Sequence, residues 1–156
     1  MKKIIVFVIV AAAIVYGGYI VNQNLDASAK DTATKEASEA KALEAKMMEG
    51  FTTEDLVIGT GNEATAGSQI IVNYRGSLKE TGKEFENSYT KKSPLILTLG
   101  TGEVIKGWDI GIVGMKVGGK RRLTIPPALG YGAAGRGDII PPNATLVFDV
   151  ELVEIR

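Results

Sequence analysis

"EVIKGWDIG", residues 103–111, holds the only tryptophan of the chain. Ile105, Trp108 and Ile112 are spaced i, i+3 and i+7, so they fall on one side of a helix. Gly114 lies where such a helix would end. The stretch therefore predicts one short helix that presents a large aromatic side chain on its apolar side. Trp108 is then either an ordinary core residue or the floor of a pocket that a ligand enters.

Four segments around this helix have the composition and periodicity of β-strands. Residues 69–78 mix β-branched and aromatic side chains, and residues 95–100 form a compact apolar run. Residues 120–126 and 145–155 alternate between apolar and polar side chains. The last segment places on one face Leu146, Phe148, Val150 and Leu152. One short helix against an antiparallel sheet predicts an α+β domain, which we place at residues 51–156.

The composition excludes several classes of chemistry. The chain has no cysteine and no histidine, which removes thiol nucleophiles, disulfides, histidine-based triads and the usual zinc sites. Its 18 basic side chains balance 18 acidic ones, so nothing indicates nucleic-acid binding. No cofactor is expected. What remains for function is carboxylates, hydroxyls, lysines, backbone groups or a shaped apolar pocket.

Residues 1–21 have the pattern of a membrane-targeting segment. Lys2 and Lys3 precede an uncharged, mostly apolar run, Ile4–Val21, which as a helix of about 27 Å would just span a bilayer core. We favour an uncleaved signal anchor that leaves the domain on the extracytoplasmic side of a membrane, in a bacterial envelope. A signal peptide cleaved at the small residues Ala27–Ala29, which would give a secreted protein, is the alternative.

Residues 22–50 are rich in alanine, lysine and glutamate, a composition that favours helix. Lys35 and Glu39 are four residues apart and would lie on one helical face. Thr34 is a candidate N-cap and Gly50 a candidate C-cap. We interpret the segment as a partly helical, solvated linker, with a partner-binding helix as the alternative.

Four motifs follow one another within residues 51–156. They are YRGSL at residues 74–78, VIKGWDIG at 104–111, GYGAAG at 130–135 and IIPPNATLVFDVEL at 139–152. In order and spacing, residues 51–156 resemble the FKBP family of peptidyl-prolyl cis–trans isomerases. The resemblance implies a bent, half-open antiparallel β-sheet wrapped around one short central α-helix, which agrees with the strands and helix expected above.

The resemblance also resolves the question about the tryptophan, because in this family the proline ring of the substrate lies on it. It implies catalytic roles for Tyr74, Phe85, Glu86, Ile105, Trp108, Tyr131 and Phe148. It implies substrate contacts for Leu95, Leu97, Lys91, Val104, Ile139 and Ile140. The Ile105 N–H and the Tyr131 hydroxyl would bind substrate carbonyls. We expect Gly107 to let backbone and ligand approach each other.

Some positions depart from the family pattern. Glu86 stands where aspartate is common, and Lys91 stands where arginine is common and lacks its planar fork. Leu95 and Leu97 are aliphatic where the family is often aromatic. We expect these changes to preserve isomerase activity and to weaken macrolide binding.

The sequence thus predicts a prolyl isomerase that acts on exported or envelope proteins by non-covalent catalysis in an apolar aromatic pocket. Its expected partners are proline-containing polypeptides, macrolide inhibitors and a membrane, with no nucleic acid, and the catalytic domain is expected to be monomeric. Two alternatives stay open. One is a catalytically idle module that holds proline-containing segments, and the other is a structural appendage whose interface is the linker at residues 22–50.

Overall fold

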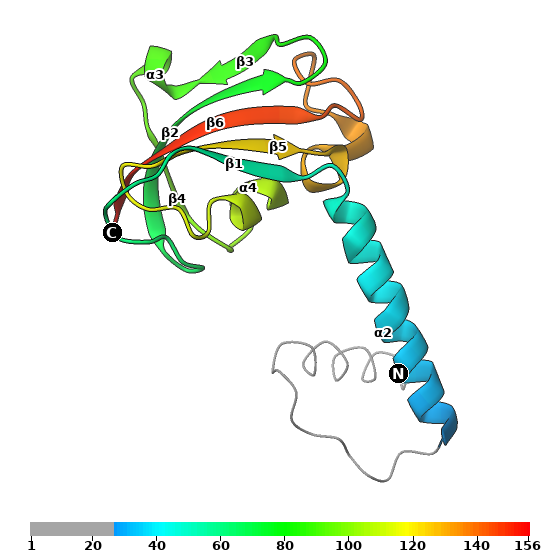
Figure 1. Ribbon diagram of the computed structural model, residues 1–156. Helices are drawn as coiled ribbons and strands as arrows, with labels where there is room; N and C mark the ends of the chain where they lie inside the picture. Colours follow the sequence, from blue (N-terminus) through cyan, green and yellow to red (C-terminus); the bar gives the residue numbers. More distant parts are fainter. Residues whose placement is uncertain (1–26) are drawn as a thin grey trace. The chain divides into compact units, whose positions relative to one another are not determined.

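The computed structural model describes residues 27–156, and side chains among them from residue 32 (Figure 1). The signal segment predicted at residues 1–21 lies outside the described residues. Within the described part, no helix is both long enough and apolar enough to cross a membrane. Residues Ala42–Arg156 form one compact unit, which contains the whole sheet.

Helix α2 (Ala27–Met48) is longer than the sequence indicates. Thr34 lies inside the helix, so its predicted role as N-cap is wrong, because the alanine-rich residues before it continue the helix. The predicted pair of Lys35 and Glu39 forms, with 3.9 Å between Nζ and Oε1. Gly50 follows the helix with φ +80°, as expected of a residue that ends a helix. In the last turn, Met47 packs against the core of the compact unit.

Among the described residues, six strands form one antiparallel sheet, which confirms the predicted α+β class. In chain order they are β1 (Thr52–Val57), β2 (Gln69–Leu78), β3 (Glu84–Asn87), β4 (Leu95–Thr98), β5 (Lys120–Ile125) and β6 (Leu146–Ile155). The spatial order is β1-β5-β6-β2-β3, and β4 pairs with β2. The part of the chain from β1 to the end of β6 also contains short helices: α3 (Ser88–Lys91), α4 (Lys106–Gly111), and the 3₁₀ turns η1 (Pro127–Leu129) and η2 (Gly132–Ala134). The sheet curves over α4 (Figure 1).

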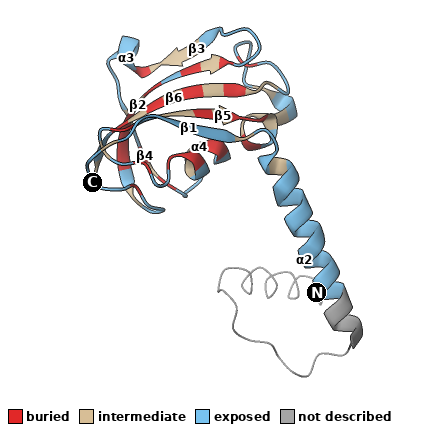
Figure 2. Cartoon of the chain, viewed as in Figure 1, coloured by how far each residue is buried: buried red, intermediate tan, exposed pale blue. Residues whose placement is uncertain are grey.

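The core lies between the concave face of the sheet and α4. The alternation predicted for β6 is confirmed, since this strand buries Leu146, Phe148, Val150 and Leu152. Figure 2 shows the buried segments along β2, β5, β6 and α4. Burial of these apolar side chains is the main contribution that holds helix and sheet together.

Two glycines allow α4 to approach β5 closely. A Cβ added at Gly107 would lie 2.6 Å from Cγ2 of Ile125, and one added at Gly111 would lie 2.8 Å from Cδ2 of Leu123. Real Cβ atoms do not make such contacts, so larger residues would push the helix off the sheet. Gly107 is buried, and the Ile125 side chain fills the place that a Cβ would take, so packing against β5 explains this glycine without the expected approach of a ligand.

The solvent face of the sheet carries a charge network around Asp149. Its carboxylate accepts hydrogen bonds from Arg122 over 2.7 and 3.0 Å and from Arg75 over 3.2 Å. The Arg122 hydrogen bond lowers the pKa of Asp149 below 3.8, against the opposing effect of burial. Because the pKa of Asp149 is lower in the folded than in the unfolded protein, its ionised carboxylate stabilises the fold at every pH above the unfolded-state pKa. This stabilisation is lost as the pH falls through the folded-state pKa.

We therefore expect Asp149→Asn to be less stable than the wild type at pH 7, by about 1 kcal/mol or less, because the network is partly solvated. The difference should shrink below pH 3.8 as Asp149 takes up a proton. Urea unfolding of both proteins as a function of pH measures this, and a difference that grows on acidification would contradict it.

Candidate functional site

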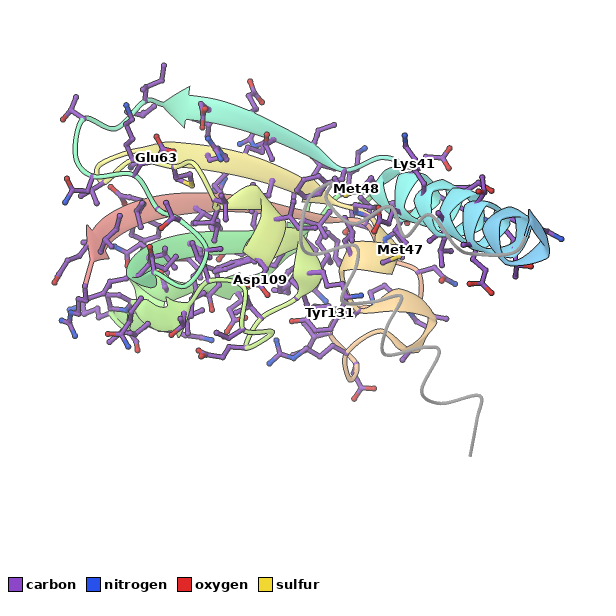
Figure 3. The ribbon with its side chains drawn as sticks, turned by 90° about the horizontal axis from the view of Figure 1, so that it is seen from below. Lys41, Met47, Met48, Glu63, Asp109 and Tyr131 are labelled. Carbon is purple, nitrogen blue, oxygen red and sulfur yellow. The ribbon has the colours of Figure 1, made fainter. Side chains whose placement is uncertain are left out.

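An open cavity of about 510 Å³ lies between the concave side of the sheet, α4 and the loops that precede α4 and β6. Its walls are formed by Tyr74, Glu86, Leu95, Glu103, Val104, Ile105, Trp108, Tyr131, Arg136 and Phe148. The size suits a ring and the few residues around it. Figure 3 views this region from below, with Tyr131 labelled.

Aromatic rings set at right angles build the floor. The Trp108 ring centre lies 5.0 Å from that of Tyr74 and 5.2 Å from that of Phe148, with interplanar angles of 86° and 89°. Phe85 stands edge-on to Phe148 at 5.5 Å. Trp108 is 3 % exposed, and its indole N–H has no hydrogen-bond partner among the described residues. Edge-to-face packing of this kind fixes the rings, so the floor is rigid and apolar.

A glycine in β2 makes room for this cluster. A Cβ at Gly76 would lie 2.7 Å from ring carbons of both Phe85 and Phe148. Because β2 pairs with β6 through Gly76 and Phe148, the missing side chain lets both rings settle over the strand. The glycine of the YRGSL motif is thus explained by packing.

Glu86 is the charged centre of one wall. Its carboxylate lies 3.0 Å from Lys91 Nζ and 3.8 Å from Arg136 Nη1. Burial raises the pKa of Glu86, but the hydrogen bond from Lys91 and the nearby Tyr74 hydroxyl outweigh it, so the net pKa lies below 4.5. Burial and the nearby Glu86 raise the pKa of Tyr74 to about 12. Both shifts lead away from neutrality, so Glu86 stays ionised and Tyr74 stays protonated near pH 7.

Two hydrogen-bonding groups stand at the rim of the cavity. Ile105 precedes α4 in an extended conformation, with φ −61° and ψ 147°. Its carbonyl accepts from Trp108, whereas its N–H makes no backbone hydrogen bond among the described residues. The Tyr131 hydroxyl accepts a hydrogen bond from Arg136 over 3.0 Å. An N–H and an O–H are therefore available where a peptide would enter.

The structure brings together eight of the thirteen residues expected from the resemblance: Tyr74, Glu86, Leu95, Val104, Ile105, Trp108, Tyr131 and Phe148. Phe85 supports the floor through Phe148 rather than lining the cavity. Lys91 reaches the site only through its contact with Glu86.

Three expected substrate contacts lie elsewhere in the described structure. Leu97 and Ile140 are each 2 % exposed and belong to the core, so they do not line the cavity. Ile139, in contrast, is 55 % exposed on the loop before β6. The loop turns Ile140 inward and leaves its neighbour in solvent.

Two lining residues, Glu103 and Arg136, were not singled out from the sequence. Glu103 accepts hydrogen bonds from the Thr98 amide and the Thr101 hydroxyl, so it closes the turn before α4. Arg136 lies between two glycines, five residues after Tyr131. Its charge and its place in the short loop that follows Tyr131 are the features of the sequence that could have indicated a site residue.

Fold and cavity together define a small α+β protein whose half-open sheet and single helix enclose an aromatic, peptide-sized pocket. The family described as FKBP-type peptidyl-prolyl cis-trans isomerase matches residues 61–153. An FK506-binding protein of Neisseria meningitidis serogroup B is 55 % identical over 106 residues, which cover 68 % of this chain and 96 % of the relative. The isomerase FPR2 of Saccharomyces cerevisiae is 52 % identical over 94 residues, covering 60 % and 70 %.

A comparison with solved structures points to the same family. The crystal structure of AtFKBP13 is similar with a TM-score of 0.64 and 44 % identity, over 69 % of this chain and 94 % of that one. The chain belongs to the FKBP-type peptidyl-prolyl cis-trans isomerase family. Its activity is the isomerisation of Xaa–Pro peptide bonds, as predicted from the sequence.

Proposed function

We propose that the cavity isomerises Xaa–Pro bonds without any covalent or proton-transfer step, with the proline ring on Trp108. The observation that carries this is the rigid floor of Trp108, Tyr74 and Phe148, in which every ring is edge-on to a neighbour or tilted against it. A flat apolar surface of this kind matches a proline ring and excludes water from the bond beside it.

The chemistry follows from the peptide bond itself. Its partial double bond gives a rotation barrier of about 18–20 kcal/mol. Rotation removes the resonance, so the twisted amide carries less separated charge than the planar amide. An apolar pocket therefore destabilises the planar ground state more than the transition state. Each tenfold gain in rate needs about 1.4 kcal/mol, so a few such effects make a useful catalyst.

The polar groups of the rim have holding roles in this proposal. The N–H of Ile105, which pairs with no other described backbone group, binds one substrate carbonyl, and the Tyr131 hydroxyl donates to another. Glu86 and Tyr74 lie close enough in the cavity wall for the carboxylate to raise the pKa of the Tyr74 hydroxyl. These contacts fix the peptide on both sides of the bond that turns.

We also propose that the cavity binds macrolides, since the N. meningitidis relative is named an FK506-binding protein. Weaker binding than in members with aspartate and arginine is expected, because Glu86 pairs with Lys91 and Arg136 instead. Leu97 is in the core, so of the two aliphatic replacements only Leu95 lines the cavity.

The activity test uses the full chain and short Xaa–Pro peptides that differ in the residue before proline. Acceleration that FK506 suppresses competitively supports the proposal and places catalysis in this cavity. Peptide binding without acceleration for any residue before proline would instead favour the idle module.

We further propose that residues 1–21 anchor the chain so that the domain acts on exported proteins. The support is Lys2 and Lys3 followed by the apolar run Ile4–Val21. Alkaline extraction of membranes from cells that express the full chain tests this. A chain that stays in the membrane at full mass supports the anchor, whereas a soluble product that begins near residue 29 supports cleavage.

A further inference from the structure

The Arg136 guanidinium contacts two other side chains of the cavity, Tyr131 and Glu86. Its Nη1 donates a hydrogen bond to the Tyr131 hydroxyl oxygen over 3.0 Å. Its central carbon lies 5.5 Å from the centre of the Tyr131 ring. The same Nη1 lies 3.8 Å from Oε2 of Glu86 on β3. Arg136 thus links the loop before β6 to the opposite wall of the cavity.

This contact fixes the direction of the Tyr131 hydroxyl. A guanidinium group has only donors, so the Tyr131 oxygen must be the acceptor. A phenol has a single proton, which is then left for a different acceptor. The adjacent positive charge also makes this O–H a stronger donor. A hydroxyl held in this way is prepared to donate to a carbonyl oxygen that enters the cavity.

The backbone that carries Arg136 is held firmly. Arg136 N donates to the Ile140 carbonyl over 2.8 Å, and Ile140 N donates to the Arg136 carbonyl over 3.2 Å. The Ile140 side chain is buried in the core. The loop tip between these two residues includes the exposed Ile139. The backbone from which the Arg136 side chain reaches Tyr131 is therefore held by paired hydrogen bonds.

We propose that Arg136 is a positioning residue for prolyl isomerisation, which holds the Tyr131 hydroxyl so that its proton points to a substrate carbonyl. This rests on the proposed role of Tyr131. The Arg136 side chain is 60 % exposed, so its ion pair with Glu86 contributes little to folding stability. Arg136 therefore affects the rate of isomerisation rather than folding stability, and it does so through the Tyr131 hydroxyl oxygen.

The test is a double-mutant cycle in the full chain, with kcat and KM measured on one Xaa–Pro peptide. Arg136→Ala is expected to lower kcat/KM about three- to tenfold, the range for one lost hydrogen bond. Arg136→Lys should recover part of this, because lysine keeps the charge and one donor. In a Tyr131→Phe background, Arg136→Ala should have no further effect, because the oxygen through which it acts is gone.

Arg75→Ala is the matched control. Arg75 is 54 % exposed, pairs with Asp149 at 3.2 Å and Glu84 at 3.9 Å, and does not line the cavity. It should keep kcat/KM within about twofold of the wild type, as expected of a surface ion pair away from the site. Thermal unfolding of every variant confirms that the proteins compared are folded.

Two results would overturn the inference alone: an unchanged kcat/KM in Arg136→Ala, or an equal loss from Arg136→Ala with and without the Tyr131 hydroxyl. The second result would mean that Arg136 touches the substrate directly. A wild-type rate for Tyr131→Phe would overturn the inference together with the proposed role of Tyr131. Isomerisation by the wild-type chain is measured in the same series. A wild-type chain that does not accelerate isomerisation would contradict the cavity proposal itself, and this result is distinct from the three above.

Discussion

Trp108→Ala is expected to bring prolyl isomerisation close to the uncatalysed rate. The substitution removes the ring on which the proline lies and leaves Tyr74 and Phe148 without the edge-to-face contacts at 5.0 and 5.2 Å. Water then reaches the amide, and the preference for the twisted form is lost. Because Trp108 is also buried, the free energy of unfolding should fall by about 3–5 kcal/mol.

Ile112→Ala separates the two effects. Ile112 directly follows α4, is fully buried in the same core and does not line the cavity. Its truncation should cost about 2–5 kcal/mol of stability while the folded protein keeps its kcat/KM. Peptide isomerisation and urea unfolding are measured for both variants. A folded Trp108→Ala protein with nearly wild-type kcat/KM would show that the floor is not needed.

Gly135→Ala is expected to reduce both stability and activity through the loop that carries Tyr131 and Arg136. Gly135 has φ +64° and ψ −158°, a conformation essentially reserved for glycine. A Cβ there would overlap the Ile140 carbonyl oxygen, which accepts the hydrogen bond from Arg136 N. The backbone strain alone costs about 1–3 kcal/mol. Displacement of the two side chains should lower kcat/KM by about tenfold.

Gly137→Ala is the matched control two residues further along. Gly137 also has positive φ, +54°, but apart from its chain neighbours no described residue comes within 4 Å of the position that its Cβ would occupy. It should show only the cost of the left-handed conformation, about 1–2 kcal/mol or less, with little change in kcat/KM. Equal effects of the two substitutions on kcat/KM would mean that the close packing at Gly135 does not position the site.

Strands β5 and β6 and the helix α4 could be predicted from the sequence because each of them buries one face. β6 and β5 alternate as expected, and α4 buries Trp108 as expected. Strand β1 was missed because all six of its residues are exposed, so no alternation marks it. It is held instead by backbone pairing with β5 and by the ion pair of Asp55 with Arg121 at 2.6 Å.

The types of residue in the candidate site could be predicted, but not which of them line the cavity and which are buried in the core. Leu95 and Leu97 share one face of β4, yet Leu95 lines the cavity and Leu97 is covered by the core. A pattern with a period of two cannot separate these positions. Arg136 was missed because its role depends on a loop that turns back through Gly135, which sequence spacing does not show.

If the cavity catalyses rotation without proton transfer, kcat/KM should not change with pH near neutrality, and the pH profile of kcat/KM measures this. The pKa of Glu86 lies below 4.5 and that of Tyr74 is about 12, so neither group titrates near neutrality. For the full chain and an uncharged Xaa–Pro peptide, we predict a flat profile from about pH 6 to pH 9. A bell-shaped or sloping profile in that window, with the protein folded throughout, would show that a titrating group takes part and would rule out rotation without proton transfer.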